Sequence, residues 1–138
     1  MKTKTTRMPK KQSLSQLHKK LWQVFSEYIR RKAADANGFV RCISCGSVHH
    51  WKAVDCGHYI SRIHWYTRYS EMNNNPQCKR CNAFLQGNAV GYRQGLVEKY
   101  GNEAVCSLEE SKNYPASYTR DGLMMRIEDY KRKLKELK

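Results

Sequence analysis

Two Cys-x-x-Cys pairs are the groups in this chain with the clearest chemistry. The first pair is Cys42 and Cys45, and the second is Cys78 and Cys81. Two thiolates at this spacing can converge on one ion, and four of them complete the tetrahedral sulfur shell that Zn²⁺ prefers. A pair of disulfides would need an oxidising compartment, which no feature of the chain indicates. The spacing therefore predicts one structural zinc site.

A carboxylate and a histidine lie between the two pairs, and an amide follows the last cysteine. Asp55 and His58 are three positions apart, and Asn82 comes directly after Cys81. Carboxylate and amide oxygens are hard ligands that suit Mg²⁺ or Mn²⁺. An imidazole whose pKa lies near neutral can take a proton from water. We therefore expect Asp55 and Asn82 to hold a catalytic Mg²⁺ or Mn²⁺ and His58 to act as the general base of phosphodiester hydrolysis.

Short strands and one helix must position these groups. Residues 39–41 read as a strand that leads into the first cysteine pair, and residues 51–60 have the β-branched and aromatic content of a second strand. Because side chains alternate along a strand, Asp55 and His58 would point to opposite faces unless the strand bulges. Gly57 between them is the expected site of a bulge. A helix should begin at the second cysteine pair and carry Asn82 on its first turn.

The segment from residue 40 to residue 105 resembles a known family. Its landmarks are the strings CISCG, DCGHY, NNNPQCKRCN and GN. A D-x-x-H strand before a C-x-x-C-N helix start is similar to the ββα-metal (HNH) nucleases, including phage endonuclease VII, and the whole string more closely resembles the phage NinG/Rap recombination family. The resemblance implies an α+β fold with a zinc-stapled ββα-metal core between flanking helices.

The same resemblance implies an activity and further site residues. The activity is a metal-dependent endonuclease acting on branched DNA such as Holliday junctions and D-loops, and recombination proteins are possible partners. An asparagine before the second cysteine pair braces the loop between the paired strands in these nucleases. Asn73 stands at the matching distance and joins His58, Asp55 and Asn82 in the expected catalytic set.

The charge balance indicates a polyanionic partner. The 138 residues include 26 Lys and Arg against 12 Asp and Glu, a formal net charge of +14. Aromatic residues interleave with arginines at positions 62–69, which suits phosphate contacts with base stacking or a wedge, and equally suits rings packed on a small core. Eight basic side chains are expected to contact DNA: Lys19, Lys20, Arg30, Arg31, Arg62, Arg68, Lys79 and Arg80.

The chain divides into four expected parts. Apolar residues from Leu14 to Tyr28 recur at threes and fours, as in an amphipathic helix, and Ser13 with Gln16 can form its capping box. A last helix carries a seam from Leu123 to Leu137, which can form a coiled-coil dimer or pack back on the first helix. Because a junction needs two symmetric cuts, we expect a homodimer. The parts are a flexible basic arm (1–12), an N-terminal helix (13–38), the nuclease core (39–105) and a C-terminal helical extension (106–138).

Other readings of the chain remain open. No apolar run approaches the roughly 20 residues that span a bilayer, so we expect a soluble protein in the cytoplasm, that of the host if it is phage-encoded. A non-catalytic zinc-knuckle protein that binds DNA or RNA would explain the cysteines and the charge but not Asp55, His58 and Asn82. A purely structural zinc module is a third reading. Among the remaining groups, Cys56 is expected to be a buried apolar filler, the role of Cys106 is open, and His49, His50 and His64 are expected on the surface or in packing.

Overall fold

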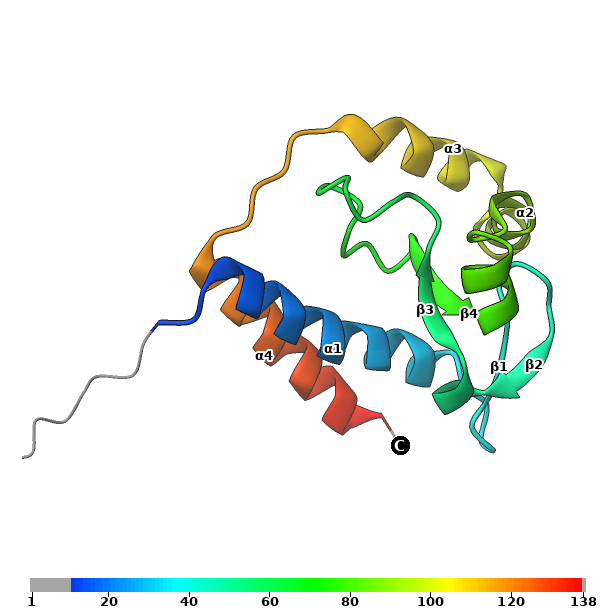
Figure 1. Ribbon diagram of the computed structural model, residues 1–138, viewed down its shortest axis with the longest axis horizontal. Coiled ribbons are helices and arrows are strands. Elements are labelled where there is room, and N and C mark those ends of the chain that lie inside the picture. Colours follow the sequence, from blue (N-terminus) through cyan, green and yellow to red (C-terminus); the bar gives the residue numbers. More distant parts are fainter. Residues whose placement is uncertain (1–10, 138) are drawn as a thin grey trace, which may run out of the picture.

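The computed structural model describes residues 11–137 (Figure 1). The basic arm expected over residues 1–12 therefore lies almost wholly outside the described residues. Helices and short strands together make a mixed α+β fold, as predicted. In chain order the elements are α1 (Leu14–Lys32), β1 (Phe39–Arg41), β2 (Val48–His50), η1 (Trp51–Ala53), β3 (Asp55–His58), β4 (Asn74–Gln77), η2 (Arg80–Phe84), α2 (Ala89–Tyr100), α3 (Asn102–Glu110), η3 (Ser111–Asn113) and α4 (Arg120–Glu136).

Helix α1 begins as its sequence predicts and ends earlier than expected. The Ser13 hydroxyl accepts from the Gln16 N–H and the Gln16 side chain accepts from the Ser13 N–H, which completes the capping box. The helix ends at Lys32 and not near Gly38. The Asp35 carboxylate accepts from the N–H groups of Asn37 and Phe39, each at 2.9 Å, and this local turn replaces further helix.

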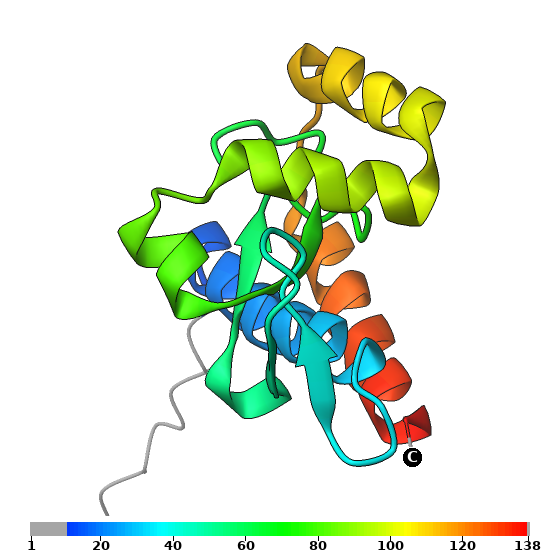
Figure 2. The same ribbon diagram turned by 90° about the vertical axis from the view of Figure 1, so that its right-hand side faces the viewer.

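Helix α4 packs against α1 within the same chain. Both views of the ribbon show the two helices side by side (Figures 1 and 2). The rings of Phe25 and Tyr130 meet edge to face with centroids 5.0 Å apart. The shared core contains Leu17, Leu21, Phe25 and Ile29 of α1 with Leu123, Ile127 and Tyr130 of α4.

This packing decides between the two arrangements that the seam allowed. Since Leu123 is 0% exposed and Ile127 is 5% exposed, the first half of the seam is covered by α1 and is not open to a second copy. The seam therefore gives no support to the expected homodimer. Helix α1 and helix α4 also enclose Cys56 and Tyr69 from the centre of the chain, so they belong to one core and are not appendages.

The strands form two antiparallel pairs, β1 with β2 and β3 with β4. The strand expected over 51–60 is shorter, because η1 precedes it as one turn of 3₁₀-helix and β3 ends at His58. The register of β3 and β4 runs without interruption, so the bulge predicted at Gly57 is wrong. A Cβ added at Gly57 would lie 2.0 Å from the Gln77 side-chain oxygen, and the glycine therefore provides room for a buried glutamine.

Helices α2 and α3 form a hairpin on the side of β3 and β4 that lies away from α1 and α4, at the upper right in Figure 1. Their core contains Tyr92, Leu96, Val105 and Leu108 together with Ile60. The Tyr92 hydroxyl donates to the Gly57 carbonyl at 2.7 Å and ties α2 to β3. Helix α3 crosses position 105, so the domain boundary expected there falls inside a helix. Within residues 11–137 no helix combines the length and the apolar character needed to cross a membrane.

Candidate metal centre and catalytic groove

The four cysteines of the two pairs come together as predicted. Cys42 follows β1, and Cys78 lies between β4 and η2. The ligand atoms of Cys42, Cys45, Cys78 and Cys81 all lie within 4.8 Å of one another, and the Sγ atoms of Cys45 and Cys78 are 3.7 Å apart. Four thiolates at about 2.3 Å from one zinc ion would have neighbouring sulfurs separated by about 3.8 Å. The cluster is therefore compatible with tetrahedral zinc.

The surroundings of the cluster also suit bound thiolates. All six cysteines of the chain are free thiols. The Cys81 N–H donates to the Cys78 sulfur at 3.5 Å, and the Asn88 amide donates to the Cys81 sulfur at 3.4 Å. Burial raises the pKa of Cys81, whereas hydrogen bonds with Ser47 lower the pKa of Cys45. A divalent cation would offset the cost of burying thiolate charge at the three enclosed cysteines.

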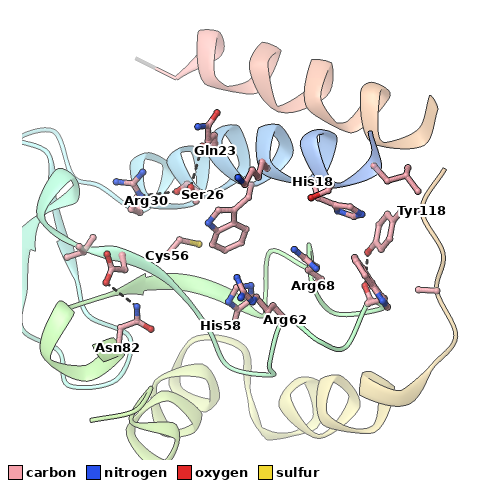
Figure 3. A pocket seen from close by; sticks show the side chains of 18 of the residues that line it. His18, Gln23, Ser26, Arg30, Cys56, His58, Arg62, Arg68, Asn82 and Tyr118 are labelled. Atoms are coloured by element: carbon pink, nitrogen blue, oxygen red, sulfur yellow. Dashed lines mark hydrogen bonds between the residues drawn. The ribbon is translucent and has the colours of Figure 1, made fainter. Parts of the chain in front are cut away.

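Asp55 and Asn82 lie side by side, although 27 positions separate them. Asp55 opens β3, and Asn82 lies on η2, which follows the second cysteine pair. The Asn82 amide donates to Asp55 Oδ2 at 3.0 Å, the dashed line at Asn82 in Figure 3. Lys79 Nζ lies 2.8 Å from Asp55 Oδ1. Burial acts to raise the pKa of Asp55, but the hydrogen bonds from Lys79 and Asn82 outweigh it, so the pKa lies below its ordinary value. The carboxylate is therefore ionised at neutral pH.

His58 lies on the other face of β3, against α1. Its ring stacks on the Trp22 ring with centroids 4.7 Å apart and planes 14° apart. Burial, and then the charges of Arg68 and Arg62, lower the pKa of His58 to about 4. Within residues 11–137 its Nε2 atom is enclosed and has no hydrogen-bond partner, which leaves Nδ1 as the nitrogen available to the groove that His58 lines. The imidazole is therefore neutral at pH 7.

Asp55, Cys56 and His58 of β3 all line one groove of about 1600 Å³, together with residues of α1, η2, the loop that joins β3 to β4 and the segment 116–118. Figure 3 shows His58 and Asn82 on one side of this groove, with α1 on the opposite side. Asp55 is the single carboxylate among the lining residues, all of which lie within the described part of the chain. Six basic side chains line it: Lys19, Arg30, Lys52, Arg62, Arg68 and Lys79.

The loop that carries Arg62 and Arg68 is held in place from within. The Asn73 side chain accepts from the Ile60 N–H at 2.7 Å and donates to the carbonyls of Ile60 and Thr67 at 3.0 and 3.2 Å. Asn73 is 0% exposed, so it braces the loop and does not reach the groove. The bracing contacts expected of Asn73 are thus present, and its part in catalysis stays a prediction.

The structure brings together most of the residues predicted for the site. Lys20, Arg31 and Arg80 do not line the groove, unlike the other five basic side chains of the predicted set. Histidines 49, 50 and 64 also lie outside it. His49 bonds to Ser47 next to the cysteine cluster, and His50 caps η1. Cys56 is buried beside α1, as the filler interpretation requires, and burial raises its pKa to about 12.

Several groove residues were not predicted from the sequence, among them His18, Trp22 and Lys52. Trp22 covers the candidate base, and the His18 ring bonds to the Tyr69 hydroxyl at 2.7 Å. Trp22 follows the buried Leu21 on α1 and is itself partly exposed, so the helical period assigns it to the edge of the core. A tryptophan at the border of an apolar stripe was the available signal.

Comparisons with known proteins give the chain relatives. The family model described as "Bacteriophage Lambda NinG protein" matches residues 1–138. The curated "Protein ninG" of Escherichia phage lambda is 32% identical over 123 residues, covering 82% of this chain and 58% of the relative. "Protein ninG" of Salmonella phage P22 is also 32% identical over 123 residues and is covered to 59%. The chain thus spans less than two thirds of the length of these relatives. No solved structure matches the chain significantly.

Proposed function

The chain belongs to the NinG family, and we propose that it is a metal-dependent endonuclease that cleaves branched DNA during phage recombination in the host cytoplasm. The observation that carries the proposal is the contact between Asp55 and Asn82 in a groove that also holds His58 and six basic side chains. A protein that only bound phosphates would gain nothing from a carboxylate placed there. The branched substrate rests on the resemblance noted above, whereas the charge supports DNA in general.

The order of elements supports the ββα-metal type of core. Strand β3 carries Asp55 and His58, a braced loop leads to β4, and η2 then carries Asn82. The four cysteines bracket this unit and fix η2 against the end of β1. We assign their zinc a structural role, since all four coordination positions are filled by protein.

The pair Asp55 and Asn82 fits a hard divalent cation. The carboxylate is ionised and one third exposed, and the Asn82 amide lies within hydrogen-bond distance of it. Turning the Asn82 amide by half a rotation would present its oxygen in place of its nitrogen, which makes an oxygen pair suited to Mg²⁺ or Mn²⁺. When bound there, the ion would stabilise charge on the phosphate and on the leaving 3′ oxygen.

His58 would take the proton of the attacking water. A neutral ring whose proton is on Nε2 offers the lone pair of Nδ1 to the groove. Its low pKa makes it a weak base in the free protein. Arg62 and Arg68 contribute to that low pKa, so a DNA phosphate that neutralises them would raise the basicity of His58 when substrate binds. Lys19 and Arg30 are placed to hold the flanking phosphates.

Cleavage of labelled four-way junctions and of supercoiled plasmid, with zinc-loaded protein and added Mg²⁺, tests this proposal. Wild type should cut, and His58→Ala should lose roughly 100- to 10,000-fold in rate, the contribution of a positioned base. Asp55→Asn should fall similarly. Both variants should keep their zinc, because neither residue contacts the cysteine cluster. Their junction affinity should also stay near wild type, because the basic side chains of the groove are unchanged.

The matched control is His64→Ala, a histidine of the same loop region that does not line the groove. It should keep most of the activity. Wild-type protein that binds junctions but never cuts them with Mg²⁺ or Mn²⁺ would replace the nuclease proposal with the non-catalytic DNA-binding alternative.

A further inference from the structure

The turn formed by residues 84–88, here called the Phe84 turn, presents an apolar tip at the end of the short helix η2, which carries Asn82. The Phe84 side chain is 79% exposed and that of Leu85 is 45% exposed. Phe84 ends η2, two positions after Asn82. Figure 2 shows η2 and this turn in green at the left edge of the molecule, before α2 begins. A single exposed apolar residue is ordinary on a protein surface. Phe84 differs in the hydrogen bonds that hold its turn and in the charge around it.

The Phe84 turn is fixed in an unfavourable backbone conformation. Gln86 and Asn88 have φ angles of +50° and +40°, which side-chain-bearing residues rarely adopt, and Gly87 between them has +90°. Such conformations persist where the surrounding structure imposes them. The fold therefore holds this turn in one backbone conformation.

Three hydrogen bonds anchor the Phe84 turn to the metal centre and to β4. The Gly87 N–H donates to the Cys81 carbonyl at 2.9 Å, and the Asn88 amide donates to the Cys81 sulfur at 3.4 Å. The buried Gln77 amide donates to the Gly87 carbonyl at 2.6 Å. The turn that carries the exposed Phe84 ring is thus hydrogen-bonded to Cys81, one of the four residues of the cysteine cluster.

The charge around the Phe84 turn selects its partner. Lys79 and Arg80 are exposed at the start of η2. Lys79 is paired with Asp55 at 2.8 Å, whereas Arg80 forms no ion pair with any described residue. No acidic residue occurs in the sequence between Glu71 and Glu98. A second copy of this chain, with its formal charge of +14, would be repelled by such a surface, whereas DNA would be attracted.

We propose that Phe84 is an apolar wedge that enters between base steps of the DNA held in the groove. The inference rests on the proposed function for its ligand, DNA, and not on cleavage. Inserted Phe and Leu side chains unstack a step, which costs free energy that depends on how firmly the step is stacked. Stacking is already interrupted at a branch point, so the wedge would favour branched DNA over regular duplex. Phe84 would then be a residue that determines substrate selectivity.

Fluorescence of 2-aminopurine tests the wedge without any cleavage. The probe base is placed at the branch of a four-way junction, or in the middle of a matched duplex, and protein is added without Mg²⁺. Wild type should raise the fluorescence of the junction probe. Phe84→Ala should abolish most of this rise and weaken junction binding by roughly tenfold, within the range of losing one base–aromatic contact. Duplex affinity and the salt dependence of binding should change little, because no phosphate contact is removed.

Phe84→Leu should retain part of the rise, and Met125→Ala is the matched control, since Met125 is 74% exposed on α4. A Phe84→Ala variant with wild-type fluorescence and junction affinity would overturn the inference. So would light scattering that shows wild type to self-associate through Phe84. If wild type gives the fluorescence rise but never cuts, the nuclease proposal fails and the wedge stands. If wild type cuts, and Phe84→Ala discriminates junctions from duplex as well as wild type does, the nuclease proposal stands and the wedge inference fails.

Discussion

Adding one methyl group at Gly57 should destabilise the protein strongly, although Gly57 lies in a regular strand with no unusual backbone angle. The Cβ of Gly57→Ala would lie 2.0 Å from the side-chain oxygen of Gln77 and 3.0 Å from its Cβ. Gln77 is 0% exposed and cannot swing into solvent. Its amide holds the carbonyl of Gly87 at 2.6 Å and the hydroxyl of Ser44 at 2.9 Å. The added methyl must therefore displace a side chain that connects β4 to the first cysteine pair and to the Phe84 turn.

The size of the effect follows from these contacts. Overpacking a filled site costs about 1–3 kcal/mol, and leaving a buried amide without its partners costs about 1–3 kcal/mol more. We expect the free energy of unfolding to fall by about 2–6 kcal/mol. For a chain of this length that corresponds to a drop in melting temperature on the order of 10 °C.

Thermal unfolding followed by circular dichroism, at fixed excess zinc, measures this drop. Gly122→Ala is the matched control, because its methyl meets only the Thr119 hydroxyl at 3.0 Å in the first turn of α4. Its stability should stay within about 1 kcal/mol of wild type. Gly57→Ala should cost less stability in a Gln77→Ala background than in wild type, since the contact with the side-chain oxygen at 2.0 Å has gone and only the contact with the Cβ at 3.0 Å stays. Strictly additive effects, or a Gly57→Ala protein that melts with wild type, would refute the reasoning.

Three further predictions concern the metal centre, pH and salt. Cys78→Ser should release zinc and unfold the domain, because metal binding in such sites is coupled to folding; zinc retained at one equivalent in a folded variant would contradict this. The folded-state pKa of His58, lowered to about 4 by burial, predicts that its contribution to stability is complete above its unfolded value of about 6.5 and is lost as pH falls toward 4. Urea midpoints should show this loss for wild type, and His58→Phe should reduce it. The logarithm of the DNA-binding constant should fall linearly with the logarithm of salt concentration, and Arg62→Ala or Arg68→Ala should reduce the slope by about 0.9 each, whereas Lys20→Ala, outside the groove, should leave it unchanged.

Features set by local spacing were predicted from the sequence. The four cysteines meet because each pair lies on one tight turn, so only one long-range contact is needed to assemble them. The capping box of α1 and its buried stripe follow from a helical repeat that spans five turns. The proximity of Asp55 and Asn82 was expected from the chemistry that the two would share, and the hydrogen bond between them confirms that proximity.

Features decided by tertiary packing were not predicted. A glycine between two site residues suggested a bulge, but its purpose is to make room for a glutamine on the neighbouring strand. The seam of α4 has the same pattern whether its partner is α1 or a second copy, so the pattern could not choose between them. Strand β2, with two histidines in three residues, gives no alternation to recognise. The Trp22 stack on His58 joins residues on separate elements, and periodicity carries no information about it.

The pairing of α1 with α4 has a consequence for the order in which the protein can assemble. Helix α1 is made first, but the apolar stripe through Leu21 and Phe25 is covered only when α4 has been made, after all of residues 33–119. At translation rates of about 5–20 residues per second, that stripe waits roughly 5 to 20 s for its partner. The cysteine cluster requires only residues up to Cys81 and can bind zinc in the meantime. Since residues 116–118 also line the groove, the cysteine cluster can assemble in the nascent chain well before the groove is complete.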